Sequence, residues 1–171
     1  MTTIRSTASR RDVETAIAKM VGEECWAIIA GPGTGSVILL DLGAKLPRDH
    51  VLRNPNLTED ERRFESAYSV HVWCSWRVEE AGRVVGSAAA LPDEGWWERS
   101  GLARVKGQRL TGFDFGTTIP DLQLHFDNVS LAMFADTLSK DGEDCAYTLR
   151  TPDEIFVVFA NGDLLSERVE V

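Results

Sequence analysis

The sequence predicts an α+β protein that is mostly antiparallel β-sheet, with about nine or ten strands in hairpins and one amphipathic helix near the N-terminus. Two patterns carry this prediction. Apolar and polar residues alternate in short stretches along most of the chain, which is the period of a strand with one buried face. Only a few turn-forming residues separate many of these stretches, and such short connections join antiparallel neighbours. At 171 residues the chain is long enough for one domain, residues 1–171, with a sizeable core.

The helix is expected directly after residues 1–8, which we expect to be frayed. Ser9 and, three residues later, Asp12 form the pattern of a helix N-cap with an acidic residue in the first turn. Apolar residues then recur at helical spacing, at Val13, Ala16, Ile17 and Met20. Gly22 is the expected end, since glycine commonly terminates helices.

Two buried strands, 25–30 and 36–42, follow the helix. The segment GPGTG at 31–35 between them is a turn and not a phosphate-binding loop, because a strand rather than a helix follows it. Residues 43–66 contain several prolines and a run of charges, so they predict a long excursion with a short helix near 59–65. Excursions of this length tend to be functional or mobile.

The second half of the chain contains most of the predicted strands. Residues 70–78 give the cleanest alternation, with His71 and Trp73 on the mixed face. A hairpin at 121–134 is expected at the centre of the fold, with its turn at Asp127-Asn128. The remaining strands are predicted at 83–90, 110–115, 147–151, 155–160 and 164–169. Asn161-Gly162 is the strongest short hairpin signal and precedes the last of them.

Charge and composition exclude several classes of function. The net charge is −9 and the pI about 4.8, which argues against binding to nucleic acid or to an anionic membrane surface. The same charge suits a basic protein partner. The three cysteines, Cys25, Cys74 and Cys145, are widely spaced and predict no disulfide framework. The chain shows neither a secretory signal pattern nor a long apolar run, so we expect a cytoplasmic protein.

Catalytic and metal-binding motifs are missing from the sequence. His71 and Cys74 are three residues apart on one predicted strand, so they point to opposite faces, and neither has a further histidine or cysteine nearby to give the paired spacing of zinc sites. No GxSxG elbow occurs. We therefore expect no cofactor, no metal and no enzymatic activity. The alternative hypothesis is a ligand-binding or catalytic pocket between the sheet and residues 43–66, using His50, His71 or His125.

Two features favour protein binding instead. Trp96 and Trp97 are adjacent in a loop, where both cannot easily enter a core, and tryptophan is enriched in interface hot spots. If they are not exposed anchors, one closes the end of the sheet and the other lies flat on the surface. Residues 136–171 carry nine acids against three bases, a net charge of −6. The candidate partner contacts are Glu94, Trp96, Trp97, Asp141, Glu143 and Asp144.

From Ser36 onward, the order of segments resembles small bacterial α+β proteins of the toxin-immunity type. The segments are GSVILLDLG, HVWCSWRVE, GQRLTGFDF, DLQLHFDNVSLAMF and CAYTLRTPDEIFVVFANGDL. The resemblance is one of sequence style, and it implies a protein that binds and neutralises a partner, with no catalytic residues to carry over. The first hypothesis is therefore a non-enzymatic binding protein, monomeric or a small homo-oligomer, such as an immunity protein that covers the active site of a basic toxin. A structural subunit in an obligate oligomer is a third hypothesis.

Overall fold

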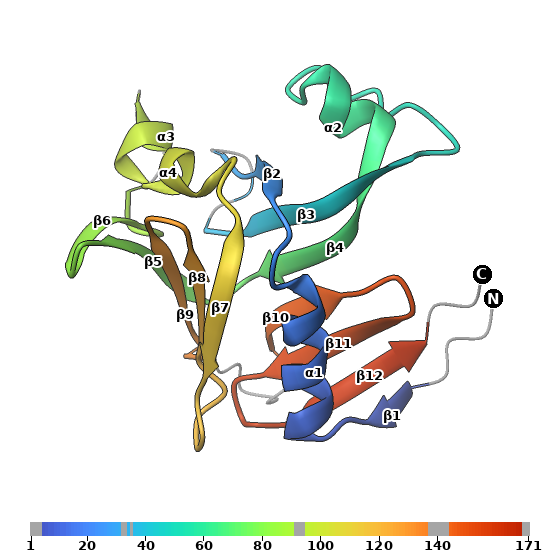
Figure 1. The fold of residues 1–171 in the computed structure, drawn as a ribbon, viewed down its shortest axis with the longest axis vertical. Coiled ribbons are helices and arrows are strands. Elements are labelled where there is room, and N and C mark those ends of the chain that lie inside the picture. Colours follow the sequence, from blue (N-terminus) through green and yellow to red (C-terminus); the bar gives the residue numbers. More distant parts are fainter. Residues whose placement is uncertain (1–4, 32–33, 35, 91–94, 137–143, 169–171) are drawn as a thin grey trace.

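The computed structural model describes residues 5–31, 34, 36–90, 95–136 and 144–168, and these form twelve antiparallel strands in two sheets with one long helix (Figure 1). The predicted α+β, mostly antiparallel fold is confirmed, although the strands outnumber the nine or ten expected. None of the helices in these ranges is long and apolar enough to span a membrane.

Helix α1 (Arg10–Met20) forms where the sequence predicts it. Ser9 is its N-cap and exchanges hydrogen bonds with Asp12 in a capping box, which satisfies N–H groups that the first turn leaves unpaired. The side chain of Arg10 donates to the carbonyl oxygens of Phe115 and Gly116, fixing the start of the helix on the second sheet. Its buried residues, all predicted, are Val13, Ala16, Ile17 and Met20.

The larger sheet has seven strands and combines both ends of the chain. Its order is β1 (Arg5–Thr7), β12 (Leu164–Arg168), β11 (Glu154–Phe159), β10 (Cys145–Arg150), β4 (Phe64–Val72), β3 (Ile38–Pro47) and β2 (Cys25–Ile29). The expectation that residues 1–8 are frayed is wrong for its second half, because β1 pairs with β12 and Ala8 is buried. In the glycine-rich turn between β2 and β3, the Thr34 N–H donates to the Gly31 carbonyl at 2.9 Å.

The smaller sheet has five strands, and the predicted central hairpin is in it. Its order is β6 (Arg83–Ser87), β5 (Ser75–Glu80), β9 (Ser130–Phe134), β8 (Leu122–Phe126) and β7 (Leu110–Phe115). The hairpin of β8 and β9 buries Leu122, Leu124 and Phe126 on its inner face, as the alternation indicates. Strand β6 passes so close to Ser100 that a Cβ on Gly86 would lie 2.1 Å from that residue's backbone, so glycine is required there.

The alternation at 70–78 predicts a single strand, and the structure corrects this to two strands in different sheets. The N–H groups of Trp73 and Cys74 both donate to the carbonyl oxygen of Ala146, at 2.9 and 3.0 Å, and the chain bends there from β4 into β5. Every second residue stays buried across the bend. The pattern therefore continues while the sheet changes.

Residues 43–66 are also more regular than expected. Strand β3 continues to Pro47, β4 begins at Phe64, and the excursion shrinks to a loop at 48–58 and helix α2 (Glu59–Arg63). The predicted short helix is confirmed, and Thr58 caps it through a capping box with Glu61. Residues 45–63, which we call the arm, project from the body of the molecule (Figure 1). The loop predicted around Trp96 and Trp97 contains helix α3 (Trp96–Arg99), and α4 (Leu102–Val105) follows it.

The core lies between the inner faces of the two sheets and α1. Residues directly opposite one another in antiparallel strands share a face. One inner row of the large sheet is therefore Ile38, Val72, Tyr147 and Val158, and all of these are buried. The Tyr147 hydroxyl donates to the Pro120 carbonyl at 2.7 Å and so ties β10 to the segment before β8.

Candidate functional site

The two tryptophans of the predicted contact site belong mainly to the fold. Trp96 and Trp97 are half-buried, pack against the core and meet edge to face with ring centroids 5.6 Å apart. Their role as partner contacts stays a prediction. Of the predicted acidic contacts, Asp144 is half-buried directly before β10, whereas Glu94, Asp141 and Glu143 lie outside the described residues.

The three histidines of the alternative hypothesis lie on separate elements. His50 is exposed on the arm, His71 is half-buried on β4 and His125 lies on β8 in the other sheet. A pocket of about 360 Å³ does lie between β2 and α2, but Trp26, Ala27, residues 58–61 and Lys106 line it, with no histidine. The pocket beside helix α2 is therefore lined by none of the three predicted histidines.

His125 accepts or donates hydrogen bonds on both ring nitrogens. Its Nδ1 lies 2.9 Å from the Ser130 Oγ and its Nε2 lies 2.7 Å from the Asp114 Oδ2. These residue types match a Ser-His-Asp relay, but Ser130 sits inside a strand that is paired on both sides, with His125 and with Glu79. A nucleophilic serine needs free N–H donors aimed at an oxyanion, and here the sheet ladder uses the strand's backbone.

The cysteines are also unsuited to catalysis. Burial raises the pKa of the Cys74 thiol to about 12 and that of Cys145 to about 11, and it raises the pKa of Cys25 further. Thiolate, the nucleophilic form, is therefore scarce at neutral pH. Within the described ranges, no three His, Cys, Asp or Glu side chains gather as metal ligands.

The outer face of the large sheet has a different character. One row of directly opposed residues crosses all seven strands, and we call it the outer stripe: Ile29, Leu39, His71, Thr148, Val157, Leu165 and Thr7. Thr7 is exposed and the other six are half-buried. Its four aliphatic side chains are not among those that form the core or pack against it. They make a second apolar surface, separate from the core.

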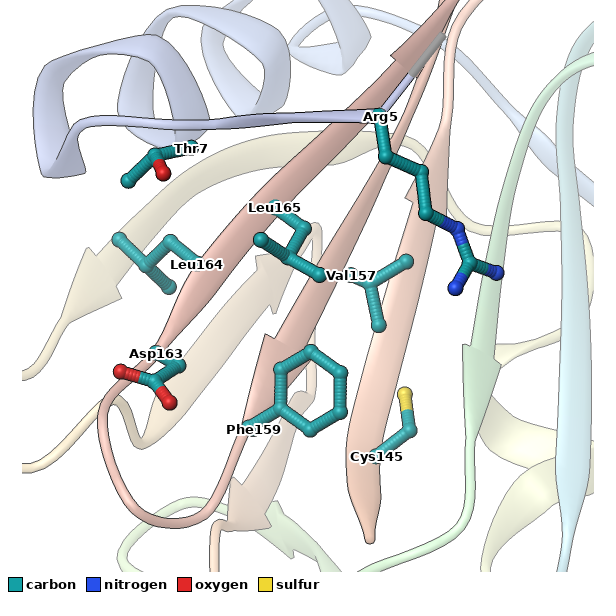
Figure 2. A pocket seen from close by; sticks show the side chains of 8 residues that line it. All are labelled: Arg5, Thr7, Cys145, Val157, Phe159, Asp163, Leu164 and Leu165. Carbon is teal, nitrogen blue, oxygen red and sulfur yellow. The ribbon is translucent and has the colours of Figure 1, made fainter. Parts of the chain in front are cut away.

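A groove of about 720 Å³ lies along one half of this face, over β1, β12, β11 and β10. Its apolar floor is formed by Val157, Phe159 and Leu165, and Figure 2 shows these side chains projecting from neighbouring strands into one space. The residues lining the groove are Arg5, Thr7, Cys145, Val157, Phe159, Asp163, Leu164 and Leu165. The volume falls within the range of about 300–1,000 Å³ that is usual for ligand sites.

The margin of the groove is charged. At one end the Arg5 Nε pairs with the Glu167 Oε1 at 2.5 Å, which neutralises both groups locally. At the other end lies Asp163, which accepts a hydrogen bond from the Asn161 side chain. The margin therefore carries two acids, Asp163 and Glu167, against one base, Arg5.

The outer face of the small sheet is polar, and its side chains bond to one another. The Arg77 Nε donates to the Glu79 carboxylate at 2.6 Å, and the Gln123 amide donates to the same carboxylate at 3.3 Å. The guanidinium of Arg77 also lies over the Phe134 ring, 4.8 Å from its centroid. His125 extends this network to Asp114. This is the ordinary arrangement of an antiparallel sheet with one face in water.

The fold and this surface define a two-sheet α+β protein with an apolar stripe and groove on the outer face of its larger sheet. In the comparisons with known proteins, no family model, curated protein or solved structure matches the chain. The resemblance to toxin-immunity proteins therefore stays a prediction.

Sequence reasoning missed the outer stripe and the groove, although β11 carries a signal for them. Its sequence, EIFVVF, is apolar at five consecutive positions and does not alternate. Such a run indicates a strand with two apolar faces. Two of these five residues, Phe156 and Val158, face the core, and the other three, Ile155, Val157 and Phe159, face outward.

Proposed function

We propose that this protein is a non-enzymatic binding protein that docks a partner protein on the outer face of its seven-stranded sheet. The observation that carries the proposal is the contrast between the two outer faces. Seven strands at about 4.8 Å spacing make the stripe about 29 Å long. A standard protein–protein interface buries about 800 Å² of surface on each partner, and a patch of that area is about as wide as the stripe is long.

Energetics favour a partner with basic groups at the margin. Full burial of a large apolar side chain stabilises by about 1.5–3 kcal/mol, so completing the burial of a half-buried one adds on the order of 1 kcal/mol. The outer face offers six such side chains: Ile29, Leu39, Ile155, Val157, Phe159 and Leu165. Their sum only approaches the cost of association, about 4–15 kcal/mol. Charge pairing with Asp144 and Asp163 would supply further affinity and faster encounter.

A basic toxin neutralised by a covering immunity protein is the specific form of this proposal. The acidic balance of the chain supports it, because five acids and two bases lie in the described part of the C-terminal third, residues 144–168. The absence of any assembled catalytic group among the described residues is compatible with it. The partner itself has to be found by experiment.

The test is affinity capture from the host lysate with three tagged proteins. Wild type is compared with Val157→Lys, which places a charge on the stripe, and with Val84→Lys, a matched change on the outer face of the small sheet. We expect one stoichiometric partner that wild type and Val84→Lys retain and Val157→Lys loses. Its retention should also weaken with salt, because screening reduces charge attraction. A partner held equally by all three proteins would contradict this site.

A further inference from the structure

The arm exposes several large apolar side chains to solvent. Six large hydrophobic residues are exposed in the described parts of the chain, and three of them belong to the arm. Val51 is 58% exposed, Leu46 40% and Leu52 38%. Val51 and Leu52 are adjacent in the loop at 48–58, so they form one apolar tip.

The loop that carries this tip is firmly held. The Leu52 N–H donates to the Arg62 carbonyl at 3.0 Å, and the Arg48 N–H donates to the Arg63 carbonyl at 2.9 Å. Helix α2 is fixed in turn, since the nearly buried carboxylate of Glu61 lies 3.6 Å from the Lys106 ammonium. These contacts keep the tip on the arm and away from the core.

The charges of the arm and the groove are opposite. The arm, residues 45–63, contains five bases and four acids, a net charge of +1 in a chain of net −9, and Arg48 and Arg53 lie on either side of the tip in the sequence. The groove margin carries Asp163 and Glu167 against Arg5, a net charge of −1. On the arm, the apolar pair Val51-Leu52 thus lies between two bases in the sequence. In the groove, the apolar floor lies between two acids, Asp163 and Glu167.

We propose that the arm of one molecule docks in the groove of a second copy, with Val51 and Leu52 against Val157, Phe159 and Leu165. The inference rests on the docking face of the proposed function and names the chemistry of its ligand, an apolar pair flanked by bases. Because arm and groove are different surfaces, the contact is head-to-tail and can repeat along a chain of molecules. A partner protein and a second copy would then compete for one groove.

Sedimentation equilibrium of the full chain between about 10 µM and 1 mM tests this, since a small contact of this kind is expected to be weak. The average mass of wild type should rise with concentration past that of a dimer. Val51→Asp alone should stay monomeric, as should a groove variant alone. Two groove variants are used, Val157→Lys and the milder Thr7→Lys at an exposed position of the edge strand, so that a loss of folding in one leaves the other.

The decisive sample is an equimolar mixture of Val51→Asp with Thr7→Lys. One intact groove then meets one intact arm, so the mixture should form dimers and nothing larger. Val84→Asp is the control, because Val84 is 59% exposed, almost the same as Val51, but lies on the small sheet. It should associate as wild type does.

Two results would overturn the inference. One is wild type that stays monomeric up to 1 mM, and the other is Val51→Asp that associates as wild type does. In the second case, association lost only in the groove variants would mean that two outer faces meet each other. Either result leaves the proposed function to the capture experiment, where retention of the partner by Val157→Lys counts against it.

Discussion

The two sheets of this protein have similar inner faces, but only the large sheet has an apolar stripe across its outer face. On the small sheet, Arg77, Glu79 and Gln123 form one hydrogen-bonded network, and His125 and Asp114 extend it. On the large sheet, the corresponding positions form the outer stripe, with aliphatic residues on four of its seven strands. Both sheets are antiparallel and built from short strands, so strand formation does not explain the difference.

The difference between the two outer faces therefore lies in their side chains and not in the backbone of the sheets. An antiparallel sheet can leave one face in water, as the small sheet does, provided that this face is polar. A sheet that is apolar on both faces is stable in a protein when a second layer covers each face. The core covers the inner face of the large sheet, and a partner is the layer that we propose for the outer one.

The largest expected effect compares two phenylalanines of β11. Phe156 is buried on the inner face, and Phe159 is half-buried in the groove. Phe156→Ala should lower the free energy of unfolding by about 3–5 kcal/mol, because it leaves a core cavity. Phe159→Ala should lower it by about 1 kcal/mol but weaken partner capture by on the order of tenfold or more, since each ~1.4 kcal/mol of lost contact is tenfold.

Urea unfolding of both variants, together with capture by Phe159→Ala, measures these effects. Equal losses of stability at the two positions would mean that the groove side chains belong to the core. In that case the contrast between inner and outer faces of β11 would disappear.

Local elements of the fold were predictable because local chemistry specifies them. The capping pair of Ser9 and Asp12 is fixed by neighbours in sequence, and so is the 122–134 hairpin with its polar turn. The break at Trp73 was not predictable from alternation, because it depends on hydrogen bonds to Ala146, which is distant in sequence. Strand β1 was missed for the same reason, since three residues become a strand only beside β12.

The candidate site was predictable only in fragments. Asp144 directly precedes Cys145, which lines the groove, and its contact with a partner stays a prediction. The floor needed the strand order β12-β11-β10, which brings Leu165, Val157 and Cys145 together and follows from no local pattern. The packing of both adjacent tryptophans against the core was not predictable, because it depends on the helical turn of α3, which separates their directions.

A smaller effect is expected on the polar outer face. Asp114→Asn removes the carboxylate that faces the His125 Nε2, but the Asp114 side chain is 78% exposed. Exposed ion pairs contribute about 0–1 kcal/mol, so the free energy of unfolding should fall by less than about 1 kcal/mol. Partner capture should match wild type. If Asp114→Asn lost partner capture but kept its stability, the partner would bind the outer face of the small sheet and not that of the large sheet.

The smallest effect concerns His71, the one ionisable side chain of the outer stripe. Its ring lies 3.9 Å from that of Trp73, centroid to centroid, and burial lowers the pKa of His71 below its ordinary value of 6.5. The folded state therefore favours neutral imidazole, and the unfolded chain takes up the proton first as pH falls. The contribution of neutral His71 to the free energy of unfolding is therefore complete above pH 6.5. It declines as the pH drops from 6.5 toward the lower pKa of His71 in the folded state.

Because His71 is only half-buried, this decline should be small, and His71→Gln should abolish it. Urea unfolding of wild type and His71→Gln at a pH above and a pH below 6.5 measures the difference, and proton NMR of the imidazole gives the midpoint directly. A partner that covers the stripe buries His71 further, so it should lower the pKa again and bind more weakly in acid. A midpoint at or above 6.5 in the free protein would show that water reaches this part of the stripe as freely as it reaches the polar face.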